Sequence, residues 1–184
     1  STSRRQRQMC IRDRYYRAIC MKIEITPMTE RFAKDSWKLR NNPALWKFMK
    51  SEAPIPATLE SETKYLRAAF NNPRNNMFAI LANGEFAGYI TLKNTTCGAA
   101  KLSYCIMRQD LWHKGVVSRA TLLILQYAYE ELKLDLVYLY VNPKNIASYS
   151  NAINKHFVRA GISFVNSEVE RLEMTRTGWE KVLK

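Results

Sequence analysis

The residues best suited to chemistry occupy one junction, residues 107–118, between a predicted strand and a long predicted helix. The first N–H groups of a helix have no intrahelical acceptor and carry the positive end of the helix dipole, so they can bind an anion. Gly115 lets the chain approach a phosphate closely, and Lys114 and Arg119 add positive charge. The junction therefore predicts a diphosphate site. An ordinary helix start with solvated basic residues remains the alternative, because neither a Walker sequence nor a G-x-G-x-x-G fingerprint is present.

Strand and helix patterns surround this junction. Runs rich in β-forming residues flank Asn83-Gly84, which is a strong hairpin signal. Strands are predicted at residues 21–26, 77–81, 86–93, 100–107, 136–141, 164–169 and 171–175. Helices are predicted at residues 29–40, 44–50, 58–70, 117–132, 146–160 and 178–183. The order indicates a mixed α/β sheet with a βαβ crossover in its second half.

Composition narrows the class of protein. A chain of 184 residues with 47% hydrophobic and 24% charged residues indicates a globular protein with one core and excludes disorder. No apolar stretch approaches the roughly 18 residues that cross a bilayer, so we expect no membrane span. The four cysteines form no C-x-x-C pair and the two histidines are far apart, which argues against a zinc site or a disulfide frame. We therefore expect a cytoplasmic protein without a metal.

Net charge is +13, and the first 20 residues contribute six arginines and one aspartate to it. This segment has no apolar core of a signal peptide and resembles extraneous translated sequence, so we expect a non-native or disordered leader followed by a single domain at residues 21–184. A basic arm that grips nucleic acid is the alternative. The rest of the chain shows neither a helix-turn-helix nor a zinc pattern, so we expect no nucleic-acid partner.

The segment Trp112-His-Lys-Gly115-Val-Val117, followed by a long helix, resembles the pyrophosphate loop of GNAT acetyltransferases, in particular of the ribosomal-protein alanine acetyltransferase branch. Four further motifs resemble the family as well. They lie in the antiparallel strands before the loop (Gly88-Tyr-Ile-Thr-Leu92 and Leu102-Ser-Tyr-Cys-Ile106), in the strand after the long helix (Val137-Tyr-Leu-Tyr-Val141) and at the start of the next helix (Asn145-Ile-Ala-Ser148). The resemblance covers roughly residues 22–175 and implies the GNAT fold. In that α/β fold a mixed, mostly antiparallel central sheet has helices on both faces and a βαβ unit that binds the cofactor.

The resemblance also implies acetyl-CoA as co-substrate, wedged between two diverging parallel strands, residues 103–107 and 136–141. Backbone groups of Ile106 and Arg108 would then bind the pantetheine, with Asn145 and Ser148 on the other side. Asn145 and Ser148 could equally be helix caps. The pyrophosphate would be held by the amides of His113, Lys114, Gly115, Val116, Val117 and Ser118.

Amide formation requires a neutral amine, a hydrogen-bond donor for the tetrahedral oxyanion and a proton for the CoA sulfur. We expect the Met107 amide to be the oxyanion donor. The family commonly supplies the proton from a tyrosine, but that position holds Ala152, or Phe157 if the register contains an insertion. Lys101 stands where relatives often carry glutamate. The usual phenol is therefore missing from its place.

Three other side chains are candidates for the catalytic groups. Tyr149 is the first choice for the acid because it lies one helical turn before Ala152. Ser103 could hold a water from its strand, and Asn142, at a strand end, could orient the acceptor. Alternatively, Tyr149 has only a structural role, as an aromatic residue in the core or at the rim of the site.

The acceptor is expected to be the primary amine of a small molecule. Arg40-Asn41-Asn42-Pro43 with Phe48-Met49 is similar to GNAT enzymes that acetylate a nucleotide-linked amino sugar in bacterial nonulosonate synthesis, which makes that class the preferred acceptor. A ribosomal-protein or peptide N-terminus is the second choice, and a CoA-binding protein without catalysis is the non-enzymatic alternative. Basic residues could meet an acceptor phosphate, among them Arg67 and Arg74. We expect a monomer or a homodimer.

Overall fold

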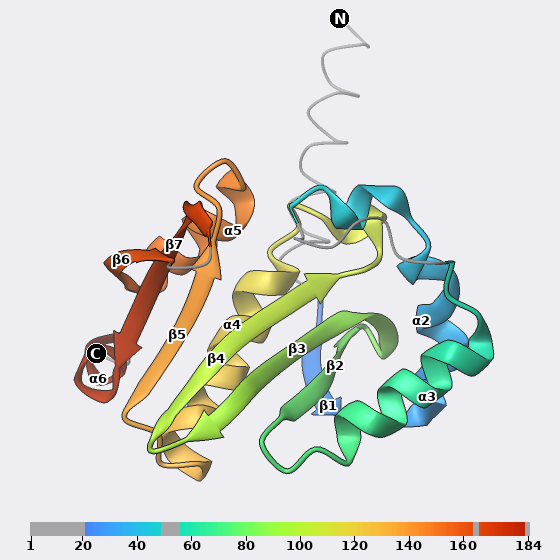
Figure 1. Ribbon diagram of the computed structural model, residues 1–184, viewed down its shortest axis with the longest axis horizontal. Coiled ribbons are helices and arrows are strands. Elements are labelled where there is room, and N and C mark those ends of the chain that lie inside the picture. The colour runs from blue at the N-terminus through green and yellow to red at the C-terminus, as the bar shows by residue number, and fades with distance from the viewer. Residues whose placement is uncertain (1–20, 49–55, 164–165, 183–184) are drawn as a thin grey trace, which may run out of the picture.

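The computed structural model describes residues 21–48, 56–163 and 166–182. The predicted leader, the end of the helix predicted at residues 44–50 and the start of the strand predicted at residue 164 lie outside the described residues. Within the described part, one sheet organises the chain (Figure 1).

The sheet has seven strands in the order β1-β2-β3-β4-β5-β7-β6. Every neighbouring pair is antiparallel except β4 and β5, which are parallel. This confirms the predicted GNAT arrangement with its βαβ crossover. The strands are β1 Ile23–Pro27, β2 Asn76–Ala82, β3 Glu85–Thr96, β4 Ala99–Ile106, β5 Leu136–Val141, β6 Val158–Ser163 and β7 Asn166–Thr175.

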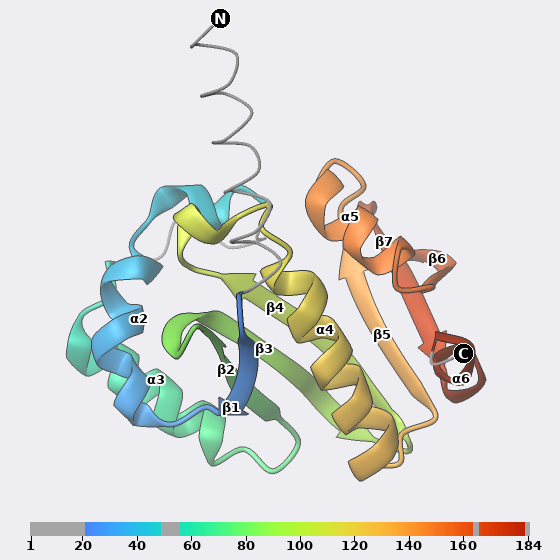
Figure 2. The same ribbon diagram turned by 180° about the vertical axis from the view of Figure 1, so that it is seen from behind.

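Helices cover both faces of the sheet, as Figures 1 and 2 show from opposite sides. On one face α2 and α3 enclose a small core with Leu66, Met77 and Cys105. On the other face α4, α5 and α6 pack over a larger core that includes Leu139 and Ile124. The helices are α2 Ala33–Arg40, α3 Leu59–Phe70, α4 Val116–Gln126, α5 Ile146–Ile153 and α6 Arg176–Val182, with a π-helical turn at Tyr127–Glu131 extending α4.

Two local signals read from the sequence are confirmed. Asn83 and Gly84 both have positive φ, as a tight hairpin turn between β2 and β3 requires. Thr58 caps α3, because its side chain accepts a hydrogen bond from the Ser61 N–H at 3.1 Å while the Ser61 hydroxyl accepts one from the Thr58 N–H at 2.9 Å.

The helix predicted at residues 146–160 was too long. It ends at Ile153, and His156 then adopts a left-handed conformation with φ of 63°, which no helix can continue. Phe157 turns into the core with 2% exposure, whereas Ile162 is 53% exposed on the new strand β6. The buried aromatic that follows the helix is therefore Phe157. The two strands predicted after residue 163 form one strand, β7.

No helix among the described residues is long and apolar enough to cross a membrane. Cys97 is exposed, Cys105 is buried, and both are free thiols.

Candidate cofactor and acceptor site

The parallel strands β4 and β5 separate soon after they meet. Their pairing is confined to Ala99–Lys101 against Leu136–Tyr138, so β4 from Leu102 onward has no strand partner on that side. Figure 1 shows the two strands diverging upward, with α4 behind them. An unpaired strand edge offers backbone groups to an extended ligand that carries amides of its own. Pantetheine is such a ligand.

The end of β4 is fastened to β3. The Ala87 carbonyl accepts hydrogen bonds from the Met107 and Arg108 N–H groups, at 2.8 and 3.2 Å. Next to it, β3 approaches so closely that a Cβ added to Gly88 would lie 2.1 Å from the Cys105 carbonyl oxygen. Only glycine fits this contact. The end of β4 is thereby fixed relative to the loop that follows.

Three of the backbone groups at the end of β4 already take part in hydrogen bonds. The Met107 amide donates to Ala87, so in this structure it is not free to stabilise an oxyanion. The Ile106 carbonyl accepts the Trp112 indole N–H at 2.9 Å, and the Arg108 carbonyl accepts the Leu111 N–H at 3.1 Å. No sequence pattern indicated the Trp112 contact.

The loop after β4 is braced by Arg108. Its guanidinium bonds Asp110 at 2.8 Å and also contacts Glu85. The hydrogen bond to Arg108 holds the pKa of Asp110 below its ordinary value, so the carboxylate stays charged at neutral pH. The Arg108 side chain serves the loop rather than a ligand.

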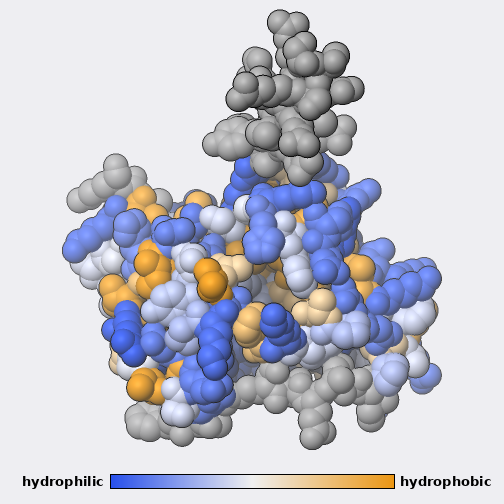
Figure 3. All heavy atoms as spheres, turned by 90° about the horizontal axis from the view of Figure 1, so that it is seen from above, coloured by the Kyte–Doolittle hydropathy of each residue, from blue (hydrophilic) through white to orange (hydrophobic). Residues whose placement is uncertain are grey.

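The predicted anion-binding residues come together at the start of α4. His113 and Gly115 have positive φ of 60° and 75° and, with Lys114, are exposed. The N–H groups of Val116, Val117 and Ser118 begin the helix, and no acceptor for them occurs among the described residues. This end of the molecule is mainly hydrophilic where Figure 3 looks down on it, which suits a charged ligand. The Arg119 guanidinium also donates to the Met21 carbonyl, and its predicted contribution of positive charge stays a prediction.

Asn142 and Asn145 both shape the turn into α5. The Asn142 Oδ1 accepts the Lys144 N–H at 2.9 Å, and the Asn145 Oδ1 accepts the Ser148 N–H at 3.3 Å as the helix cap. The capping alternative for Asn145 is thus confirmed, while the Ser148 hydroxyl is left to a different partner.

That partner is Tyr104, which the sequence analysis overlooked. The Tyr104 hydroxyl lies 2.9 Å from the Ser148 Oγ and accepts a longer hydrogen bond, at 3.4 Å, from Asn151. Asn151 also donates to Thr121 at 3.1 Å, so the network joins β4, α4 and α5. Burial raises the pKa of the Tyr104 phenol. The signal available in the sequence was alternation, since Tyr104 shares a strand face with the core residue Leu102.

Tyr149 points elsewhere. Its hydroxyl donates to the Glu170 carboxylate at 3.0 Å, and this bond raises the pKa of Tyr149. Glu170 belongs to β7, which lies on the far side of β5 from β4, and it also pairs with Arg159 at 2.8 Å. The Tyr149 hydroxyl is therefore held away from the β4–β5 divergence. Ala152 is fully buried.

On the opposite face of the sheet, Ser103 pairs in register with Thr91, and Lys101 pairs with Lys93. The Lys101 ammonium lies 5.1 Å from the Tyr140 ring centroid of β5. Figure 1 shows no described helix in front of β5 and β7, and we call this face of the divergent strands the acceptor face. The described residues contain no group of three or more His, Cys, Asp or Glu side chains that could hold a metal ion.

The family model of the GNAT acetyltransferase domain matches residues 22–153. The chain belongs to this family, which agrees with the diverging strands β4 and β5. It is an acetyl-CoA-dependent N-acetyltransferase. A comparison with curated protein sequences finds no match.

Solved structures share the fold at low sequence identity. Spermidine N-acetyltransferase from Vibrio cholerae, in complex with CoA and spermine, superposes with a TM-score of 0.74 at 15% identity, over 86% of this chain and 98% of that one. RimJ from Mycobacterium smegmatis gives 0.75 at 18% identity, over 88% of each chain. The aminoglycoside acetyltransferase AAC(6')-Ib, in complex with coenzyme A, gives 0.75 at 14% identity, over 89% of this chain and all of that one.

Proposed function

We propose that this enzyme transfers the acetyl group of acetyl-CoA to the primary amine of a small molecule, with a nucleotide-linked amino sugar as the preferred acceptor. The observation that carries the proposal is the placement of unbonded N–H groups at the start of α4 beside the unpaired edge of β4. The N–H groups at the start of α4 would bind the diphosphate of CoA, and the unpaired edge of β4 would bind the pantetheine arm that is attached to it.

In the proposed complex, the N–H groups of residues 113–118 bind the diphosphate, and Lys114 adds charge. The pantetheine follows the edge of β4 from Leu102 onward, with Asn145 and Ser148 beside it on α5. The thioester then lies between β4 and β5, where Ser103 and Asn142 border the acceptor side.

The reaction forms a C–N bond and breaks the C–S bond. The neutral amine attacks the thioester carbon, the amine loses its proton to water, and the departing thiolate takes up another proton. We assign that second proton to the hydrogen-bonded pair Ser148 and Tyr104, in place of Tyr149. The pair spans the gap between β4 and α5, and the raised pKa of Tyr104 keeps its phenol protonated.

Two of the arginines expected near an acceptor phosphate already form ion pairs with glutamates of this chain. Arg40 pairs with the buried Glu62 at 3.2 Å and stacks on Tyr65, with its guanidinium 4.3 Å from the ring centroid. Arg67 pairs with Glu30 at 2.7 Å. Arg40, in the segment that resembles the amino-sugar enzymes, therefore packs against α3 on the acceptor side and does not supply a free charge there.

The proposed function is tested by thiol release from acetyl-CoA in the presence of nucleotide-linked amino sugars, aminoglycosides, polyamines and peptide N-termini. We expect free CoA to appear fastest with the nucleotide-linked amino sugar. Turnover confined to peptide N-termini would instead support the ribosomal-protein alternative. Tight acetyl-CoA binding without release to any amine would overturn the transferase proposal.

A further inference from the structure

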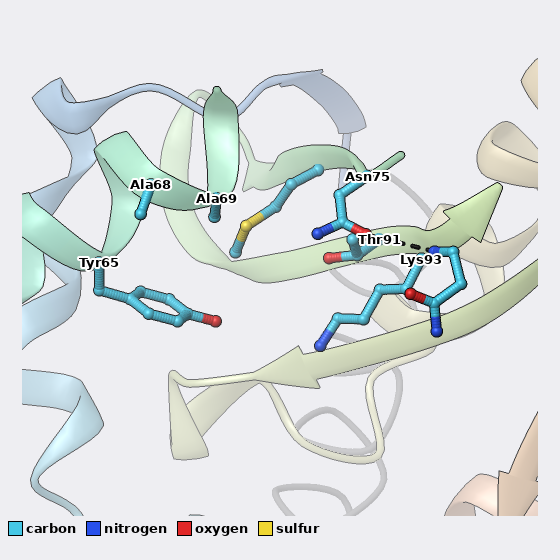
Figure 4. Close-up of a pocket in the computed structure, with 8 residues that line it drawn as sticks. Tyr65, Ala68, Ala69, Asn75, Thr91 and Lys93 are labelled. Carbon is cyan, nitrogen blue, oxygen red and sulfur yellow. Dashed lines mark hydrogen bonds between the residues drawn. The ribbon is translucent and has the colours of Figure 1, made fainter. Parts of the chain in front are cut away.

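A pocket lies on the acceptor face, between α3 and the strands β2 and β3 (Figure 4). Its volume is about 320 Å³. Tyr65 of α3 projects its hydroxyl from one side, and Lys93 of β3 extends its ammonium group from the other. Thr91 and Met77 line the wall between them. The lining thus combines hydroxyl groups and a cation on a mostly apolar surface.

Thr91 is the most informative residue of the lining. It is 1% exposed, and its hydroxyl has no hydrogen-bond partner among the described residues. A buried hydroxyl without a partner is unfavourable, because it has lost its bonds to water without replacing them. Because Thr91 lines the pocket, a ligand there can restore the missing hydrogen bond.

The charged residues around the pocket indicate the charge of that ligand. Lys93 and Lys101 lie directly opposite each other on β3 and β4, an arrangement that is destabilising for like charges. Burial lowers the pKa of Lys93, and the positive charges of Lys101 and Arg40 lower it further. Glu62 of α3, a buried carboxylate, already bonds Arg40 and Ser36. Within residues 21–48, 56–163 and 166–182 neither lysine forms an ion pair, so an anion would supply a compensating negative charge.

We propose that this pocket binds an anionic group of the acceptor, a phosphate, through Lys93 and Thr91, which both line it. The inference rests on the proposed acetyl transfer and specifies its substrate class. Neighbouring strands are about 4.8 Å apart, so the pocket on β3 lies roughly 5–10 Å from the β4–β5 divergence. The acceptor is then an amine that carries its phosphate several bonds away from the reacting nitrogen.

The test compares two probes that differ by one phosphate, glucosamine 6-phosphate and glucosamine. Calorimetry in the presence of CoA measures their binding without requiring catalysis. We expect the phosphorylated sugar to bind at least about tenfold more tightly, the contribution of one charge-assisted hydrogen bond. In Lys93→Gln this preference should fall to within about twofold. It should persist in Lys34→Gln, which removes an exposed lysine from α2.

Thr91→Val provides a second variant that is not confounded by misfolding. It removes a hydroxyl that has no partner, so thermal stability should be unchanged or higher while the affinity for glucosamine 6-phosphate falls. The inference is overturned if wild-type protein binds both sugars equally, or if Lys93→Gln keeps the preference. Phosphate-dependent binding without thiol release from acetyl-CoA would instead sustain the pocket and reject the proposed transfer.

Discussion

Replacing Tyr104 with phenylalanine is expected to lower kcat by about 100-fold, at the lower end of the range for a positioned proton donor. The phenol bonds Ser148 across the gap between β4 and α5, so its loss leaves the departing thiolate to the serine or to water. The ring that packs against the core is retained in phenylalanine, so CoA affinity should change by less than about threefold. Steady-state kinetics combined with a CoA titration separates the two effects.

Tyr149→Phe is the matched control, because the Tyr149 hydroxyl is bound to Glu170 beyond β5. We expect its kcat to stay within about twofold of wild type. Ser148→Ala added to Tyr104→Phe should cost less than the product of the two single effects, since the two hydroxyls act as one unit. A loss of kcat in Tyr149→Phe with full activity in Tyr104→Phe would reverse the assignment.

Gly88→Ala is expected to lower the free energy of unfolding by about 3 kcal/mol, the scale of an overpacked buried site. The added Cβ would lie 2.1 Å from the Cys105 carbonyl oxygen, which is backbone and cannot rotate away. Relief requires β3 and β4 to separate where Ala87 holds Met107 and Arg108, so the loop ahead of α4 should lose order too. Urea unfolding measures the stability and CoA titration the consequence for the site.

The control for this change is Gly178→Ala in α6. A Cβ there meets Thr175 Oγ1 at 3.5 Å, which is ordinary contact, and alanine favours a helix more than glycine does. We expect that variant to be neutral or more stable. If both alanine variants unfolded at the wild-type urea concentration, the close approach of β3 to β4 would not be a constraint on the fold.

Much of the fold could be predicted because its signals are local. Asn83-Gly84, Thr58 and the apolar run of α4 each determine a turn, a cap or a helix from neighbouring residues. The residues predicted to bind an anion lie together at the start of α4 for the same reason, since they are consecutive in the chain. His156 shows the limit, because a non-glycine residue with positive φ ended a helix that the pattern extended.

The proposed catalytic pair could not be predicted from the sequence because it depends on contacts between distant residues. Tyr104 and Ser148 are 44 positions apart, and the partner of Tyr149, Glu170, lies on a strand whose bounds were predicted incorrectly. The hydrogen bonds at the end of β4 could not be predicted from the sequence either, because the Met107 N–H donates to a carbonyl of another strand. The pocket at Thr91 and Lys93 exists only once α3 packs over the sheet.

The proposed cofactor site depends most on diphosphate binding by the start of α4. Titrating the protein with CoA and with pantetheine measures that binding directly. Pantetheine keeps the arm that would follow β4 but lacks the diphosphate and the nucleotide. We predict saturable CoA binding that is at least about 100-fold tighter than pantetheine binding, the contribution of two charge-assisted hydrogen bonds. Equal affinities for the two molecules, or no CoA binding, would contradict the account.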